Sequence, residues 1–156
     1  MANICIIDMT IETGTTAEAE GLREELQAAF DKAESENLGA YIGSDTRYIF
    51  DALAEQKGTT VTIGGWVRGA FDDYELRDCL EWLRDMVTIK KMNMGYKVLE
   101  DPARGEFDFD GETMKEYYLL DDDFPEEEEE EEIEDYFDRV EEIYRNKKVS
   151  RVVSMD

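Results

Sequence analysis

Residues 90–120, with the sequence KKMNMGYKVLEDPARGEFDFDGETMKEYYLL, contain the strongest indication of the fold. Apolar and polar residues alternate along much of 90–99 and 104–109, which is typical of strands with one buried face. Asp110-Gly111 is a two-residue hairpin signal, and residues 112–120 can then return as the next strand. The stretch therefore predicts consecutive antiparallel strands.

Two more strands are expected before this stretch. Residues 3–12 are rich in Ile, and residues 59–67 are rich in β-branched side chains. Gly64-Gly65 interrupts the second of these strands, and such a pair indicates a bulge or the close approach of another backbone.

Three helices are expected between and after these strands. The first begins at Thr15 or Thr16 and runs to about Glu36, and 37–43 is then a connection. The second covers 44–58 and would turn Tyr48, Ile49, Ala52 and Leu53 inward. The third begins after Asp72, with Glu75 completing a capping box, and buries a stripe of Leu76, Cys79, Leu80, Leu83 and Val87.

A further helix is expected near the C-terminus. Its apolar residues recur at spacings of three and four: Ile133, Tyr136, Phe137, Val140, Ile143 and Tyr144. Glu126 to Glu132 would occupy its first turns, where the helix dipole favours anions, and Lys147 and Lys148 would lie near its end. Residues 149–155 would form a short edge strand or a tail.

The expected fold class is α+β. We expect a mixed, mostly antiparallel sheet of four or five strands with three helices on one face, similar to an elaborated ferredoxin-like sandwich, plus the acidic C-terminal helix. Residues 1–120 would form the body, and 121–156 would pack on it or extend from it.

Charge is the most unusual property of the chain. It has 41 Asp and Glu against 17 Lys and Arg, a formal net charge of −24, and 15 of these acids lie in residues 121–142 with Arg139 as the only base. Such a field favours a basic partner and opposes direct binding to nucleic acid or to an anionic membrane.

The residue types argue against an enzyme. The chain has no His, which removes the commonest general base and metal ligand, and it has no Ser-x-x-Lys pair. Its glycines do not form a phosphate-binding motif, so we expect no cofactor. Cys5 and Cys79 fit two buried free thiols in a reducing cytoplasm, and no apolar run is long enough to cross a membrane.

An ordered acidic helix has a charge density comparable to that of nucleic acid, so it can occupy a Lys/Arg channel that normally binds DNA or RNA. The residues expected to contact such a partner are Asp121, Asp122, Asp123, Glu126, Glu127, Glu128, Glu129, Glu130, Glu131, Glu132, Glu134, Asp135 and Asp138.

The acidic segment also carries a resemblance to a known class of proteins. The run Asp121-Asp122-Asp123-Phe124-Pro125 and the seven glutamates after it, in a small acidic chain without His, resemble phage-encoded nucleic-acid mimics of the anti-CRISPR and anti-restriction type. The resemblance covers about a quarter of the chain and is compositional. It implies an inhibitor, acting in the host cytoplasm, that blocks the basic site of a nuclease or defence complex.

Three other interpretations compete with mimicry. The glutamate run can be a solvated segment that aids solubility. The C-terminal helix can dock to a partner through Ile133, Phe137 and Val140, which would make the chain a non-catalytic adaptor. Alternatively, Asp108, Asp110 and the Asp121 cluster can hold a divalent cation.

Three further side chains have a plain structural interpretation. Trp66 and Trp82 are expected in the core, because aromatic residues dominate small cores. Arg68 is expected to pair with Asp72 or Asp73.

Overall fold

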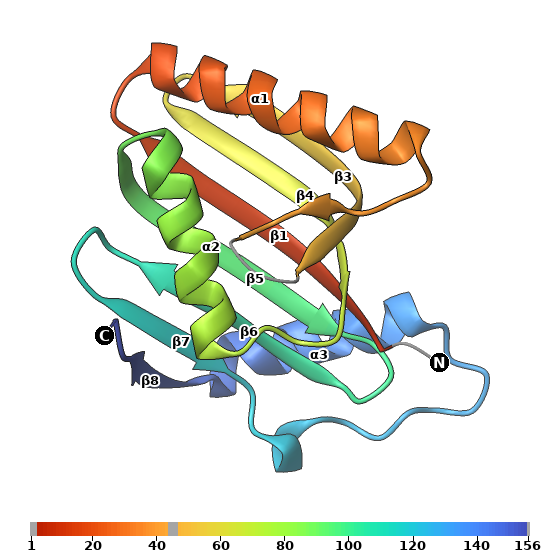
Figure 1. Cartoon of the computed structure of the whole chain (residues 1–156). Helices are drawn as coiled ribbons and strands as arrows, with labels where there is room; N and C mark the ends of the chain where they lie inside the picture. Colours follow the sequence, from red (N-terminus) through yellow and green to blue (C-terminus); the bar gives the residue numbers. More distant parts are fainter. Residues whose placement is uncertain (1–2, 44–46, 156) are drawn as a thin grey trace.

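The computed structural model describes residues 3–43 and 47–155. Its strands form one eight-stranded sheet in the order β2-β3-β4-β1-β5-β6-β7-β8 (Figure 1). The strands are β1 (Ile4–Thr13), β2 (Ala40–Tyr41), β3 (Tyr48–Lys57), β4 (Thr60–Arg68), β5 (Ile89–Val98), β6 (Ala103–Phe109), β7 (Met114–Tyr118) and β8 (Val149–Val153). The helices are α1 (Thr16–Ser35), α2 (Asp73–Met86) and α3 (Ile133–Lys147), with a short 3-10 turn η1 (Asp121–Asp123).

The α+β class and the antiparallel character of the sheet are confirmed, but the sheet is larger than expected. Every neighbouring pair of described strands runs antiparallel, so the expectation of a mixed sheet with four or five strands is wrong. The additional strands are β2, inside the expected connection 37–43, and others contributed by segments 48–57 and 149–153.

The two faces of the sheet have different coverings. On β1, Cys5, Ile7, Met9 and Ile11 are buried, whereas the residues between them point to the other side and are more exposed. We call the first side the front face; it is covered by α1 and α2 (Figure 1). The second side is the back face, and α3 covers only part of it.

The front helices form where the sequence predicts them. Thr15 is the N-cap of α1 and its hydroxyl accepts a hydrogen bond from the Glu18 amide, while Asp72 and Glu75 complete the capping box of α2. The expected stripe of α2 is buried at Leu76, Cys79, Leu80 and Leu83. On α1, Leu22, Leu26 and Phe30 are buried with Ala19, whereas Ala29 faces solvent.

The expected second helix is wrong. Its first residues, 44–46, lie outside the described residues, and 48–57 form strand β3. Register explains the error: Phe50 pairs with Trp66 and Leu53 pairs with Gly64, so a bulge at Asp51 and Ala52 faces the single Gly65. Asp51 adopts a positive φ of 51° within this bulge.

The bulge changes which side chains of β3 are buried. Ile49 and Ala54 both point to the front face although they are five residues apart. Tyr48 and Leu53, which were expected to point inward, are exposed. The alternation of apolar and polar residues that is typical of a strand is therefore interrupted in the sequence of this segment.

The hairpin between β6 and β7 has a longer loop than expected. The ladder ends at the pair Phe109 and Met114, so residues 110–113 form the turn instead of Asp110-Gly111 alone. The Asp110 carboxylate accepts hydrogen bonds from the amides of Glu112 and Thr113, at 2.9 and 2.8 Å. These bonds hold the pKa of Asp110 below its ordinary value.

The C-terminal residues complete the sheet from its far edge. After α3 crosses the back face, β8 pairs with β7, from Met114 with Val153 to Tyr118 with Val149. Of the two alternatives expected for residues 149–155, a short edge strand or a tail, the structure has the strand, at Val149–Val153. β8 therefore belongs to the same sheet as the strands of the body.

The two cysteines behave as the sequence predicts. Both are buried and unpaired in the front core. Burial raises the pKa of Cys5 to about 11 and that of Cys79 to about 12. Among the described residues, no helix has the length and apolar character needed to cross a bilayer.

Candidate partner-binding surface

The acidic segment does not begin with a helix. α3 starts at Ile133 and Glu132 is its N-cap, so the expectation that Glu126 to Glu132 fill the first helical turns is wrong. The run is instead a loop with a turn in which the Glu131 amide donates to the Glu128 carbonyl, 3.2 Å away. Glu130 adopts a positive φ of 62° at this turn.

Arg139 holds this acidic loop against α3. Its guanidinium donates to both carboxylate oxygens of Glu131, at 2.8 and 2.5 Å, and to the backbone carbonyl of Glu126 at 2.9 Å. The Tyr136 hydroxyl adds a bond to the Pro125 carbonyl at 2.8 Å. Arg139 also holds the pKa of Glu131 below its ordinary value.

The contacts of Arg139 leave most of the acidic loop facing outward. Glu126 to Glu130 and Glu132 are exposed, whereas Glu131 is partly covered by Arg139. One arginine therefore fixes the path of a segment whose like charges would otherwise repel one another.

The expected aspartates before the loop form η1. Asp121 and Asp122 are exposed, and an Asp123 carboxylate oxygen lies 3.9 Å from the Lys147 ammonium nitrogen. Lys147 is at the C-terminal end of α3, so this contact joins η1 to the far end of the helix from the glutamate loop.

The outer side of α3 is an acidic stripe. Glu134 and Asp138 are exposed at a spacing of four residues, with Asp135 beside them. The stripe continues to Glu142, also exposed, which was not among the residues expected to contact a partner. The same spacing of four from Asp138 would have identified it in the sequence.

The inner side of α3 is occupied by the chain's own sheet. Phe137 and Val140 are buried in a second apolar cluster with Leu119, Tyr136 and Tyr144. An adaptor that docks through Phe137 and Val140 would have to expose this cluster first. Ile133, at 41% exposure, remains accessible.

Polar contacts fix α3 to β6 beside this cluster. The Arg104 guanidinium makes a two-pronged ion pair with Glu141, at 2.7 and 3.0 Å, and lies over the Tyr144 ring, 4.2 Å from its centroid. The Tyr144 hydroxyl donates to Glu106 at 2.8 Å.

Glu106 is the most heavily bonded carboxylate in this contact. Burial favours its neutral form, but hydrogen bonds from Asn93 and Tyr144 and the cations Lys148 and Arg104 outweigh burial and lower its pKa. The same environment raises the pKa of Tyr144, first through burial and then through its bond to Glu106. The orientation of α3, and hence of its acidic stripe, is therefore set by charged and hydrogen-bonded contacts as well as by packing.

Two carboxylates of the competing metal-site interpretation have hydrogen-bond partners within the protein. Asp108 accepts a hydrogen bond from Asn93 at 3.1 Å, and Asp110 caps the β6–β7 turn. Over residues 3–43 and 47–155, no three Asp, Glu or Cys side chains gather as a ligand set for a metal ion.

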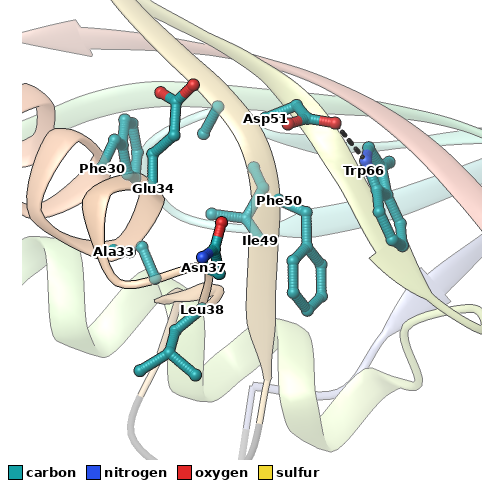
Figure 2. Close-up of a pocket in the computed structure, with 11 residues that line it drawn as sticks. Phe30, Ala33, Glu34, Asn37, Leu38, Ile49, Phe50, Asp51 and Trp66 are labelled. Atoms are coloured by element: carbon teal, nitrogen blue, oxygen red, sulfur yellow. Dashed lines mark hydrogen bonds between the residues drawn. The ribbon is translucent and has the colours of Figure 1, made fainter.

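The two tryptophans lie in different environments. Trp82 packs against the front core, as expected. Trp66 is a half-buried residue of the back face, so its expected place in the core is wrong. Its ring stacks on Phe50, with centroids 4.5 Å apart, and its indole nitrogen donates to Asp51 at 2.9 Å (Figure 2).

A cavity of about 210 Å³ lies at the edge of β3 next to this ring pair. Figure 2 shows Ile49 and Phe50 pointing to opposite sides of the strand, with Phe30 and Ala33 of α1 on the Ile49 side. Leu38 also lines the cavity and is largely exposed.

Arg68 differs from its expected role. Its guanidinium lies over the Phe50 ring, 5.4 Å from the centroid. Asp73 pairs with Arg151 instead, and the Asp72 carboxylate caps α2. The expected pairs of Arg68 with Asp72 or Asp73 are not formed.

No protein-family model, curated protein or solved structure matches this chain.

Proposed function

We propose that this chain is a non-catalytic inhibitor that presents a nucleic-acid-like acidic surface to the basic site of a nuclease or defence complex in the cytoplasm. The observation that supports the proposal is the exposed acidic side of α3 together with the loop fixed by Arg139. A surface held in one conformation loses less conformational entropy on binding than a flexible acidic tail does.

The spacing of the charges also supports mimicry. Glu134, Asp135, Asp138 and Glu142 span about 12 Å of helix axis at a rise of about 1.5 Å per residue. That is about one negative charge per 3–4 Å, close to the spacing of about 3.4 Å along one strand of DNA. Arginines that bind phosphates can pair with these carboxylates at charge-assisted strength.

We also infer that the central part of the chain is an elaborated ferredoxin-like fold. The support is the strand order β3-β4-β1-β5, with α1 joining β1 to the β2–β3 segment and α2 joining β4 to β5 across the same face. On this view, β6 to β8 and α3 are additions that carry the acidic surface.

The test is capture of partners from a lysate of the native host, eluted with a salt gradient. We expect a nucleic-acid-binding protein that elutes as salt rises and that competing DNA or RNA displaces. Replacing the six outward glutamates of the loop by Gln, with Glu131 retained for Arg139, should abolish capture. The residues changed are Glu126, Glu127, Glu128, Glu129, Glu130 and Glu132.

A charge-matched control separates mimicry from net charge. α1 and its C-cap carry six exposed acids, and their replacement by Gln or Asn changes the net charge equally. These are Glu20, Glu24, Glu25, Asp31, Glu34 and Glu36. If both variants lose capture equally, or if the loop variant retains it, the acidic loop is not the recognition surface.

A further inference from the structure

The back face of the sheet is uncovered over β3, β4 and β1. α3 packs over β6 and β7, and its cluster reaches Leu99 just after β5 (Figure 1). Strands are about 4.8 Å apart, so the span from β3 to β5 is about 14 Å wide, which is enough for one helix of about 10–12 Å diameter.

Apolar side chains form the floor of this uncovered area. Phe50, Trp66 and Ile6 are register neighbours on β3, β4 and β1. Ile4 and Leu53 extend the row on either side, and Ile4, Ile6 and Leu53 are 37%, 39% and 52% exposed. Contiguous exposed apolar residues of this kind mark interaction surfaces more often than isolated ones do.

The neighbouring register row is hollow. Gly64, Asp8 and Gly95 are paired across β4, β1 and β5, so two of three adjacent positions lack a side chain. A concavity of about 300 Å³ opens here, lined by Asp8, Leu53, Glu55 and Gly64 among others. A Cβ added to Gly64 would meet only the Asp8 carboxylate, at 3.6 Å, so a partner can approach closely at this point.

The charges around the floor specify the chemistry of the occupant. Asp8 and Glu55 lie at the hollow, and within residues 3–43 and 47–155 no donor bonds the Asp8 carboxylate. The bases Arg68 and Lys97 lie at the other end, paired in register with Ile4 and Ile6. A ligand with apolar side chains in the middle and Lys or Arg towards Asp8 matches this order.

We propose that the back-face groove, defined by Ile4, Ile6, Phe50, Leu53, Trp66 and Asp8, binds a cationic amphipathic helix of a protein partner. The apolar side of that helix packs on the aromatic and aliphatic row, next to α3. One of its Lys or Arg side chains enters the hollow beside Gly64 and pairs with Asp8. A second copy of this chain is a poorer occupant, because each copy carries a net charge of −24. The proposal stands independently of the acidic loop.

The test uses a synthetic 18-residue Leu/Lys peptide whose Leu residues follow the helical period. A composition isomer with strictly alternating Leu and Lys is the control ligand. In a Trp82→Phe background, Trp66 is the remaining tryptophan, and its fluorescence reports binding. We expect a blue shift with the helical peptide and binding at least tenfold weaker for the alternating isomer at about 150 mM salt, where the Debye length is about 8 Å.

Variants then localise the binding. Ile6→Ser with Leu53→Ser should weaken binding at least tenfold, and Asp8→Asn should weaken it severalfold. The matched control is Leu120→Ser with Val152→Ser, which removes two apolar side chains that are 45% and 70% exposed elsewhere. All of these residues are exposed, so the variants should fold, with circular dichroism as the check.

The following results would show that the peptide does not bind in the groove, or that the natural occupant is not a partner helix. Equal affinity for both peptides, or an unchanged Kd in the groove variant, overturns the proposal. Sedimentation showing a dimer that Ile6→Ser with Leu53→Ser dissociates also overturns it, because the occupant is then a second copy. The six-glutamate loop variant should bind the peptide within threefold of wild type; a larger loss assigns the binding to the loop and not to the groove.

Discussion

The front and back faces of β1 differ in burial: one face lies in the core and the other is open to solvent. Ile7 points to the front and is fully buried beneath the two helices, whereas its neighbour Ile6 points to the back and is 39% exposed. Both are the same residue type in the same strand. The difference in burial arises from what covers each face: α1 and α2 cover the front face, whereas α3 covers the back face only in part and leaves Ile6 exposed.

This contrast predicts where substitutions affect stability and where they affect binding. Front-face side chains contribute to the free energy of unfolding because they leave water on folding. Back-face side chains over β3, β4 and β1 retain much of their exposure, so their removal costs little until a partner covers them.

The largest expected effect separates Ile7 from Ile6. Ile7→Ala should lower the free energy of unfolding by about 2–5 kcal/mol, because it leaves a cavity in a packed core. Ile6→Ala should cost less than about 1 kcal/mol, because its side chain is already partly in water. Urea unfolding of both variants measures the difference, and equal losses would mean that the back face is covered.

The adjacent glycines give a second matched pair. A Cβ at Gly65 would lie 2.8 Å from the Ile49 side chain and 2.9 Å from the Phe50 carbonyl oxygen, so Gly65→Ala should cost about 1–3 kcal/mol. Gly64→Ala meets no such contact and should leave the free energy of unfolding nearly unchanged. The comparison fails if thermal unfolding ranks the two substitutions in the opposite order.

The covered part of the back face can be tested at Tyr144. Tyr144→Phe removes the donor to Glu106 and should cost about 1–2 kcal/mol at pH 7. Because the folded-state pKa of Glu106 is lowered, its contribution is full above the ordinary value of 4.5 and is lost as pH falls through the lowered value. The difference in the free energy of unfolding between wild type and Tyr144→Phe should therefore become smaller as the pH is lowered. Urea unfolding at pH 7 and at pH values below 4.5 checks this, and a deficit independent of pH would contradict it.

The smallest effect on global stability is expected at Arg139. Arg139→Gln should release the acidic loop without measurably changing the unfolding midpoint, because surface ion pairs contribute little to stability. The readout is cleavage by a glutamate-specific protease at 126–132, which should become several times faster. Arg145→Gln, on the same helix, is the control.

A titration of Glu131 sharpens the Arg139 prediction. In the wild type, Arg139 holds the pKa of Glu131 below 4.5, and in Arg139→Gln that pKa should rise towards 4.5. Carboxyl chemical shifts from nuclear magnetic resonance measure both values. An unchanged pKa would show that Arg139 does not hold the loop.

Local signals made part of the fold predictable. The spacing of Asp72 and Glu75 identified the start of α2, and Leu76, Leu80 and Leu83 identified its buried side, because capping and helical periodicity act within a few residues. Residues 48–57 were misassigned because the bulge at Asp51 hides the strand period, and the pairing that creates the bulge depends on Gly65 in another strand.

The candidate surface also has features that local sequence predicts and features that depend on contacts between separate segments. The charge of residues 121–142 and the amphipathic side of α3 were evident from composition and spacing. The path of Glu126 to Glu132 was not, because it depends on the bond from Arg139 to Glu131 and on the Tyr136 contact with Pro125. The half-buried position of Trp66 could not be predicted either, since it reflects the part of the back face that α3 leaves uncovered.

The central position of β1 has a consequence for how the chain folds during synthesis. Its two partners, β4 and β5, follow it by about fifty and eighty residues, and Cys5 pairs in register with Val98. β1 therefore leaves the ribosome before both of its partners, and it exposes one edge until residue 68 has emerged and the other until residue 98 has emerged. Pairings so distant in sequence slow folding, and unpaired strand edges are prone to aggregation. We expect nascent chains arrested before β5 to depend on chaperones.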